Sequence, residues 1–234
     1  MKIIYLIAAY NEAAILPELI EKLQKIPLQF PGSKVIIIDN ASTDHSKEIL
    51  QNLMQKHDWL IAYFESAKGM GVAFRRGLNE LKKFDLTSED WIVFNAVDLP
   101  FGFTDLEHFL KIKNSFRALL YVGSKNHPGS KLVRSWKRAL GSWIFRQVRS
   151  LLLKMKTLDP QGTLFLRADQ LFVVDATRSN DYFFTTEVVY YFEKRGPVIE
   201  MPVQLMPDVR TSKVHLLRDG LRAIQQSWDL RSRN

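Results

Sequence analysis

The alternation of short apolar runs with longer amphipathic segments limits the possible folds of this chain more than any other feature. The runs are continuously apolar, which indicates strands buried on both faces rather than strands with one solvated face. They occupy residues 2–9, 35–39, 60–64 and 91–94, and the amphipathic segments between them occupy 13–26, 46–57 and 72–84. Buried strands separated by helices predict an α/β fold with a largely parallel sheet and right-handed crossovers.

The second half of the chain has a less regular pattern. Its expected strands are 119–122, 163–166, 171–174 and 198–203, and its expected helices are 132–155, 186–194 and 216–228. The sequence contains no internal repeat and no linker-like segment. A chain of 234 residues is long enough for one large domain, so we expect a single domain over residues 1–234.

Composition excludes several kinds of site. The chain has no cysteine, which rules out disulfides, thiolate metal sites and a cysteine nucleophile. The first apolar run is short and is interrupted by Asn11 and Glu12, so it indicates a buried strand and not a signal peptide. No stretch approaches the ~18 apolar residues of a membrane-spanning helix. We therefore expect a cytoplasmic protein that is soluble or peripheral at the cytoplasmic face of a membrane.

The net charge of +8 is unevenly distributed along the chain. Residues 108–158, the basic block, contain twelve Lys and Arg residues and no Asp or Glu, so they carry +12 and the rest carries −4. A solvated basic face would explain a few such residues. An acid-free block of this length instead favours a polyanionic partner such as anionic lipid, a phosphorylated ligand or nucleic acid. Because the chain has no recognisable nucleic-acid-binding motif, we expect no nucleic-acid partner.

Within the basic block, residues 132–156 have the pattern of a long amphipathic helix. Its apolar side consists of Val133, Trp136, Leu140, Ile144, Val148, Leu151 and Met155. Its basic side consists of Arg134, Arg138, Ser142, Arg146, Arg149 and Lys156. Arg138 and Ser142 are one turn apart, so both side chains could reach one phosphate. Two interpretations stay open: an interfacial helix near anionic headgroups, and a core helix with one solvated face.

Polar residues follow each of the first four predicted strands. They are Tyr10-Asn11-Glu12, Asp39-Asn40, Glu65 and the segment 95–98. In open α/β sheets ligands bind beyond the C-terminal ends of the strands, so we expect these residues to form one polar pocket. Considered singly, Asp44 fits a helix cap and Asn11 fits a turn. The positions of Asp39 and Asp98, just after buried strands, favour a functional role for each.

Four ordered motifs at these strand ends resemble those of family 2 glycosyltransferases. The motifs are Tyr10-Asn11-Glu12, Ile38-Asp39-Asn40-Ala41-Ser42-Thr43-Asp44, Lys68-Gly69-Met70-Gly71 and Asp98-Leu99-Pro100. The resemblance covers about the first hundred residues well and continues more loosely to about Lys213. It implies a GT-A fold, in which a central, largely parallel but mixed sheet is flanked by helices. Residues 1–100 would form the donor-nucleotide half and residues 101–234 the acceptor half.

Within that family the sequence most resembles polyprenyl-phosphate sugar synthases, such as dolichol-phosphate mannose synthase. The later motifs that carry this likeness are Gly123-Ser124-Lys125, Arg138-x-x-x-Ser142, Asp159-x-Gln161, Glu187, Glu200-x-Pro202-Val203 and Ser212-Lys213. The resemblance implies inverting transfer of a sugar from a nucleoside-diphosphate sugar to a lipid-phosphate acceptor at a membrane surface. A soluble or saccharide acceptor, or a degenerate member that binds nucleotide sugar without turnover, are the alternatives.

The resemblance also assigns roles to individual residues. Donor binding falls to Ala8, Tyr10, Glu12, Asp39, Asn40, Gly69 and Asp98. Acceptor binding falls to Lys125, Arg138, Ser142 and Lys213, and the catalytic residues are Asp98 and Arg138. Asp98 would also hold the metal, Mg²⁺ or Mn²⁺.

Two positions depart from the family pattern. The family has Asp-x-Asp where this chain has Ala96-Val97-Asp98. The loss of one carboxylate should weaken metal binding, although Mg²⁺ often uses few carboxylates together with substrate phosphates, so the metal requirement stays open. Lys125 stands where the family has arginine; it keeps the positive charge but lacks the bidentate fork.

Overall fold

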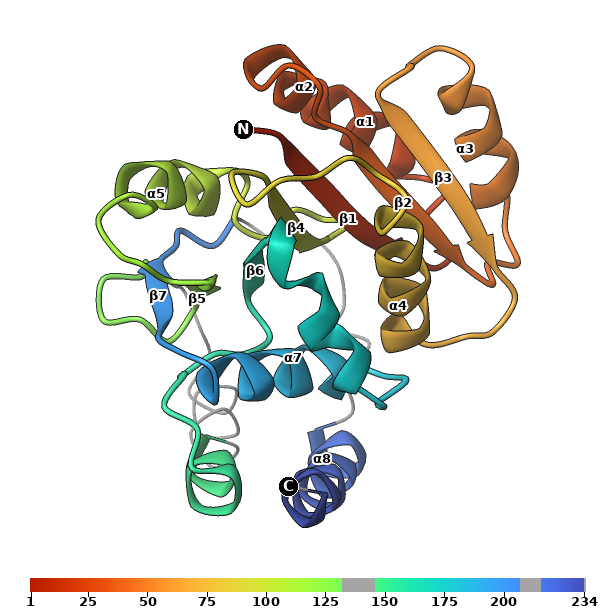
Figure 1. The fold of residues 1–234 in the computed structure, drawn as a ribbon. Helices are drawn as coiled ribbons and strands as arrows, with labels where there is room; N and C mark the ends of the chain where they lie inside the picture. Colours follow the sequence, from red (N-terminus) through yellow and green to blue (C-terminus); the bar gives the residue numbers. More distant parts are fainter. Residues whose placement is uncertain (132–145, 207–215, 234) are drawn as a thin grey trace.

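The fold is that of a computed structural model, which describes residues 1–131, 146–206 and 216–233 (Figure 1). Seven strands form one sheet in the order β3-β2-β1-β4-β6-β5-β7. The strands are β1 Ile3–Ala9, β2 Val35–Asn40, β3 Leu60–Glu65, β4 Trp91–Ala96, β5 Leu120–Ser124, β6 Thr163–Arg167 and β7 Val198–Pro202. β1 to β4 pair in parallel, β6 pairs antiparallel with β4 and β5, and β5 pairs in parallel with β7. The prediction of a largely parallel, mixed α/β sheet is confirmed.

Helices cover both faces of this sheet. Their bounds are α1 Leu16–Leu23, α2 Lys25–Gln29, α3 Ser46–Met54, α4 Met70–Leu81, α5 Thr104–Ile112, α7 Phe183–Glu193 and α8 Leu216–Ser232. Strand β1 shows why the strand runs are apolar throughout: Ile4 and Leu6 pack in the cluster that includes α4 and α7. Tyr5 and Ile7 pack in the cluster on the other face, which includes α1, α3 and α5. Full burial of each aliphatic side chain contributes about 1.5–3 kcal/mol, which favours this two-sided arrangement.

The C-terminal part of the chain forms a further layer over α7. Figure 1 shows α8 below α7, on the side away from the sheet, and the helix 146–153 at the same end of the molecule. Ala223, Ser227 and Leu230, spaced by four and three residues, form the buried side of α8. In the part of the chain that the structure describes, no helix is both long and apolar enough to cross a membrane.

Two expectations about the second half are wrong. Residues 171–174 were expected to be extended, but they belong to a 3-10 helix, η1 Ala168–Ala176. The run follows β6, which already has β4 and β5 on its two sides, so these residues cannot extend the sheet next to β6. Val173 and Val174 are buried instead in the cluster around α4 and α7. No helix was expected at α5, whose Leu106 and Phe109 are buried against the other face.

The predicted long helix at 132–155 is tested only in part. Residues 146–153 are helical, and the helix ends before Lys154, whose φ is +54°. The predicted basic side is wrong at Arg149, which is 6% exposed and donates to the Leu158 carbonyl at 3.0 Å. The first fourteen residues of the prediction, 132–145, lie outside the described residues.

Candidate active site

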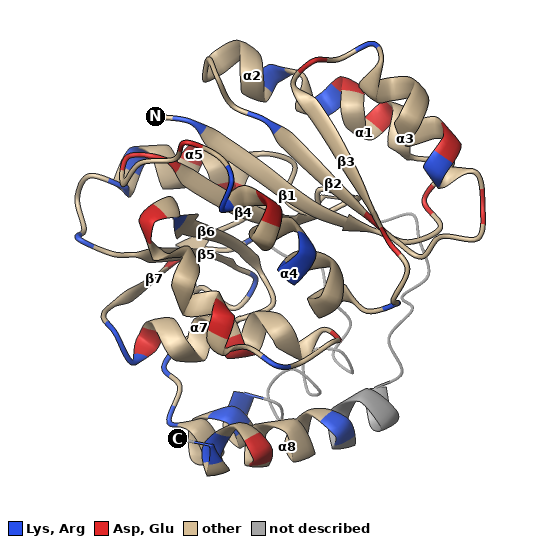
Figure 2. Cartoon of the chain, turned by 45° about the vertical axis from the view of Figure 1, so that its right-hand side comes forward, with Lys and Arg blue, Asp and Glu red and all other residues tan. Residues whose placement is uncertain are grey.

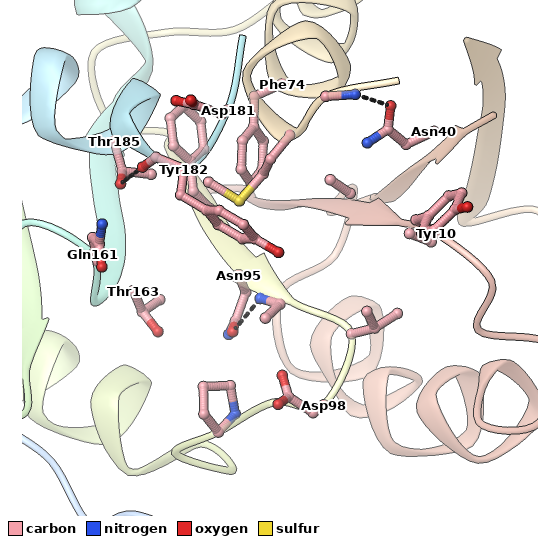
Figure 3. Close-up of a pocket in the computed structure, with 18 of the residues that line it drawn as sticks. Tyr10, Asn40, Phe74, Asn95, Asp98, Gln161, Thr163, Asp181, Tyr182 and Thr185 are labelled. Atoms are coloured by element: carbon pink, nitrogen blue, oxygen red, sulfur yellow. Dashed lines mark hydrogen bonds between the residues drawn. The ribbon is translucent and has the colours of Figure 1, made fainter. Parts of the chain in front are cut away.

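The C-terminal ends of the parallel strands open into a pocket of about 520 Å³ (Figure 3). Residues from both halves of the chain line it: Ala8, Ala9, Tyr10, Glu12, Asn40, Lys68, Gly69, Met70, Phe74, Phe94, Asn95, Ala96, Val97, Asp98, Pro100, Lys125, Gln161, Gly162, Thr163, Asp181, Tyr182 and Thr185. The structure therefore brings together seven of the residues to which the family resemblance assigns a binding role. They are Ala8, Tyr10, Glu12, Asn40, Gly69, Asp98 and Lys125. Asp39 and Glu65 do not line this pocket. Arg138, Ser142 and Lys213 lie outside the described residues.

Two turns shape the pocket beyond β1 and β2. Asn11 and Ala41 both adopt left-handed conformations, with φ of +53° and +58°. The Asn11 side chain joins the two turns, because its Oδ1 accepts a hydrogen bond from the Thr43 amide at 2.8 Å. The backbone N–H of Asn11 donates to the Ser42 hydroxyl at 2.9 Å. Asn11 is thus a turn residue, as predicted.

Asp44 secures the start of α3 and is not among the residues that line the pocket. Its carboxylate accepts hydrogen bonds from the amides of Ser46 at 3.0 Å and Ala13 at 3.1 Å. Burial alone would raise its pKa, but the hydrogen bonds from Ser46 and Ala13 outweigh burial and leave the pKa below the ordinary value. Its predicted helix-capping role is consistent with these contacts.

Asp39 lies at the end of β2 and is 4% exposed. Its Oδ2 accepts a hydrogen bond from the Ser42 amide at 3.3 Å. Its Oδ1 is buried and has no hydrogen-bond partner among the described residues. A buried carboxylate oxygen without a partner is costly, so a ligand N–H or a water molecule placed there would be stabilised. The next residue, Asn40, lines the pocket.

The glycines before and within α4 allow the two halves of the pocket wall to meet. The Gly69 amide donates to Asn40 Oδ1 at 2.9 Å, as Figure 3 shows. A β-carbon on Gly69 would overlap the carbonyl oxygen of Asn180, and one on Gly71 would overlap that of Ser179. Because both positions lack a side chain, the segment that carries Asp181 and Tyr182 can lie against the start of α4.

The side chain of Lys68 packs against the ring of Tyr10 at the pocket wall. The Lys68 ammonium lies over the Tyr10 ring, 3.8 Å from its centroid. Such cation–π contacts fix the ring and keep positive charge at the pocket wall. The sequence motif Lys68-Gly69-Met70-Gly71 pointed to this segment, but only the structure shows that Lys68 itself lines the pocket.

Asp98 is the exposed carboxylate at the end of β4. Figure 3 shows it pointing into the pocket, on the side opposite Phe74 and Asp181. A tight turn follows, in which Leu99 has a φ of +43° and its amide bonds to the Ala96 carbonyl at 3.1 Å. Leu99 is 3% exposed, so burial of its side chain stabilises a turn that orients the neighbouring Asp98 outward.

The pocket offers few ligands for a metal ion. Nowhere in the described residues do three or more His, Cys, Asp or Glu side chains gather in a group that could hold one. Asn95 lines the pocket near Asp98, but its Oδ1 already accepts a hydrogen bond from the Ala96 amide at 2.8 Å. Asp98 alone does not make a protein cage. It fits an ion held mainly by substrate phosphates and water, which is a common arrangement for Mg²⁺.

Lys125 provides a second cation at the pocket wall. Its ammonium lies 3.8 Å from Asp159 Oδ2, and its backbone amide donates to the same oxygen at 2.9 Å. The long ion pair only partly neutralises the ammonium, which is 31% exposed. Lys125 therefore presents positive charge to the pocket while its backbone is fixed.

The residues that close the pocket near α7 do not belong to any of the sequence motifs. Asp181, Tyr182 and Thr185 line it, and α8 holds Asp181 through Arg222, whose Nε lies 2.9 Å from the carboxylate. Gln226 of α8 donates to the same carboxylate at 3.1 Å. No motif at these positions signalled a pocket, because their place depends on the close approach to α4. Gln161 had a signal, since it belongs to the motif Asp159-x-Gln161.

A mixed sheet with a polar pocket at the ends of its parallel strands agrees with the architecture of GT-A glycosyltransferases. The chain belongs to glycosyl transferase family 2, whose family model matches residues 5–172. A curated relative is the poly-beta-1,6-N-acetyl-D-glucosamine synthase of Staphylococcus epidermidis, which is 27% identical over 76 residues. That match covers 32% of this chain and only 18% of the relative.

Solved structures share the whole fold at low identity. Glucosyl-3-phosphoglycerate synthase from Mycobacterium tuberculosis in complex with UDP superposes with a TM-score of 0.68 at 14% identity. The match covers 99% of this chain and 80% of that chain. A second mycobacterial protein gives a TM-score of 0.70 at 13% identity, covering 99% of this chain and 75% of the other. At these identities the likeness shows the fold, which agrees with the predicted GT-A architecture.

Proposed function

We propose that this protein transfers a sugar from a nucleoside-diphosphate sugar to a polyprenyl phosphate, with inversion at the anomeric carbon. The observation that carries the proposal is that Asp98 and Lys125 line the same pocket. The first is suited to the diphosphate of a donor and the second to the phosphate of an acceptor. An acceptor phosphate held by Lys125 can then face the anomeric carbon of a donor held near Asp98.

Residues of the first half would hold the donor. Tyr10 with Asn40 and Ala8 would border the nucleoside. Asp39 does not line the pocket, so its proposed role in donor binding rests on the sequence motif. Glu12 and Gly69 line the same end of the pocket. Lys68 brings positive charge toward a diphosphate. Glucosyl-3-phosphoglycerate synthase, which shares the fold, has been solved with UDP and with Mg²⁺ or Mn²⁺.

The chemistry needs positioning more than proton transfer. A phosphate monoester has a second pKa of about 6, so it is already anionic near neutral pH. One of its oxygens forms a bond to the anomeric carbon while the bond from that carbon to the diphosphate oxygen breaks. The nucleoside diphosphate leaves with the electron pair, and no general base is required. Lys125 would orient the attacking phosphate, and this positioning lowers the barrier.

A divalent cation, when bound, would add positive charge at the leaving diphosphate, where negative charge develops. Asp98 is the residue that would hold it together with the diphosphate. Arg138, Ser142 and Lys213 stay proposed contacts of the acceptor phosphate, with Arg138 also proposed as catalytic. They lie outside the described residues, so the proposal for them rests on the sequence motifs.

Surface properties support a peripheral membrane acceptor. In the described part of the basic block, Leu151 is 75% exposed on the helix 146–153, which also carries Arg146. Trp228 on α8 is 61% exposed. Figure 2 shows basic residues along α8 at the end of the molecule away from β1 to β3. Exposed aromatic and aliphatic side chains next to cations are suited to the headgroup region of an anionic membrane.

A soluble phosphorylated acceptor is the second candidate. One structure of the same fold was solved with UDP-glucose and phosphoglyceric acid, and its phosphate would suit Lys125 equally well. A saccharide acceptor is a weaker candidate, because it makes no use of the Lys125 charge. A further candidate is a family member that binds nucleotide sugar without transferring it. The reason to consider it is Ala96, where the family pattern has a carboxylate.

The test is a transfer assay with radiolabelled UDP-glucose, UDP-N-acetylglucosamine and GDP-mannose against three acceptors. These are undecaprenyl phosphate in anionic vesicles, 3-phosphoglycerate and a β-1,6-linked N-acetylglucosamine oligosaccharide. The proposal predicts label in the lipid phase with one donor. Label only in phosphoglycerate or in the oligosaccharide would replace the lipid acceptor, and donor binding without any transfer would indicate the degenerate member.

A further inference from the structure

Three glutamates bind the backbone of two loops, residues 154–162 and 177–182, and only the later residues of each loop, Gln161, Gly162, Asp181 and Tyr182, line the pocket. Each carboxylate accepts hydrogen bonds from two consecutive backbone amides. Glu187 binds the amides of residues 178 and 179 at 2.7 and 2.8 Å. Glu193 binds those of 156 and 157, the second at 2.7 Å. Glu200 binds those of 158 and 159 at 2.8 and 3.1 Å.

Of the three, Glu200 has the most direct link to the acceptor side. It lies on β7 and holds the amide of Asp159. The Asp159 side chain in turn accepts the Lys125 amide at 2.9 Å, and its carbonyl accepts the Gly162 amide at 3.2 Å. Lys125 and Gly162 line the pocket, and so does Gln161, which lies between Asp159 and Gly162 in the sequence. The chain of contacts therefore runs from Glu200 through Asp159 to the residues that would meet an acceptor.

The backbone N–H and C=O of Leu158 are both held by side chains. Its N–H donates to Glu200, while its carbonyl accepts hydrogen bonds from Arg149 Nη2 at 3.0 Å and Asn126 Nδ2 at 3.2 Å. Arg149 is 6% exposed; burial lowers its pKa, and the carboxylates of Asp159, Glu200 and, more weakly, Glu193 oppose that effect. The negative charge of Glu200 is therefore close to the buried guanidinium of Arg149. Both side chains bind the backbone of the same short segment, residues 158 and 159.

We infer that Glu200 is a positioning residue for the acceptor, acting through Asp159 on Lys125 and Gln161. This inference rests on the proposed function, since it gives Glu200 a role in the same site. Hydrogen bonds to an ionised carboxylate are roughly twice as strong as neutral ones, so two of them fix the segment firmly. A displacement of about 1 Å at a positioning group can lower a rate about 100-fold.

The test compares Glu200→Gln with Glu193→Gln. Both variants remove one charge from a carboxylate that binds two amides, but Glu193 holds residues 156 and 157, which do not line the pocket. The acceptor probe is farnesyl phosphate, a short polyprenyl phosphate. We expect Glu200→Gln to raise its KM at least tenfold, with the Kd of the donor nucleotide within twofold of the wild type. Glu193→Gln should keep both values within twofold.

Amide hydrogen exchange gives a second readout that needs no turnover. Glu200→Gln should speed exchange of the Lys125 amide at least tenfold, and Glu193→Gln should leave it unchanged. If Glu200→Gln does not fold, Asp159→Asn replaces it, because that variant weakens the link to Lys125 and leaves the Glu200 contacts in place. Unchanged acceptor KM and Lys125 exchange, or equal effects in the Glu193 variant, overturn the inference. Absence of transfer by the wild type overturns the proposed function instead.

Discussion

Gly69 lies directly against Asn180, so that a β-carbon at position 69 would overlap the Asn180 carbonyl oxygen. The same carbonyl accepts the Gly71 amide at 3.0 Å. Gly69 also has a φ of +149°, a conformation that residues with side chains rarely adopt. This contact joins the start of α4 to the loop that carries Asp181 and Tyr182, and it makes one pocket of two segments that are distant in sequence.

Gly69→Ala should separate these two segments and damage the pocket. We expect the Kd of the donor nucleotide to rise at least tenfold, measured by calorimetry. Gly196→Ala is the matched control, because a β-carbon there meets no atom within 4 Å and should change the Kd by less than twofold. Equal donor binding by both variants would show that the contact between the halves does not shape the donor site.

Asp98→Ala should abolish sugar transfer with little loss of stability. Asp98 is exposed, so the variant should unfold at nearly the wild-type temperature. The loss of the carboxylate that helps to stabilise the leaving diphosphate should lower kcat by about 100-fold or more. The rate of nucleoside diphosphate release measures this. Asp85→Ala, at an exposed site away from the pocket, is the control. A fully active Asp98 variant would refute the assigned role.

Lys125 should act through its charge on the acceptor. Lys125→Met should raise the acceptor KM at least tenfold and spare donor binding, because it removes the ammonium from the pocket. Lys125→Arg should keep the KM near the wild-type value or lower it, since a guanidinium can bind a phosphate with two hydrogen bonds. Initial rates at varied acceptor concentration give both values. Acceptor kinetics of Lys125→Met equal to those of the wild type would contradict the assignment.

The buried carboxyl of Asp105 should make stability depend on pH. Burial raises its pKa to about 6, and the hydrogen bond that its Oδ1 accepts from the Leu106 amide at 2.8 Å only partly offsets this. The folded state therefore favours the protonated form, and stability is lost as the pH rises from about 4 through about 6. The loss amounts to about 3 kcal/mol for a pKa raised from 3.8 to about 6.

Asp105→Asn removes that titration. The free energy of unfolding of the variant relative to the wild type should therefore increase by about 3 kcal/mol between pH 4 and pH 7.5. Urea denaturation at the two pH values measures the difference. The same difference at both pH values would show that Asp105 does not titrate between them.

The donor half of the pocket could be predicted from the sequence because its strands are buried on both faces. The continuous apolar runs gave the position of β1, β2, β3 and β4, and the polar residues just after them included Tyr10, Asn40 and Asp98. Their parallel pairing then brings these residues to one edge. Asp39 was also singled out, and the structure places it at that edge, although it does not line the pocket.

The opposite wall could not be predicted in the same way. Asp181 and Tyr182 reach the pocket because Gly69 and Gly71 permit a close backbone contact, and because Arg222 of α8 binds Asp181. Neither contact leaves a periodic signal in the sequence. The strand prediction for residues 171–174 failed for a related reason. An apolar run of this length fits a strand or a buried 3-10 helix equally well until the neighbours of β6 are known.

The most direct test of the account is a calorimetric titration of the protein with UDP and GDP sugars, with and without Mg²⁺ or Mn²⁺. The account predicts saturable binding of one nucleotide, strengthened by the metal and weakened in Asp98→Ala. Absence of binding by every donor, in protein shown to be folded by its circular dichroism, would contradict the central claim that this pocket holds a nucleotide sugar.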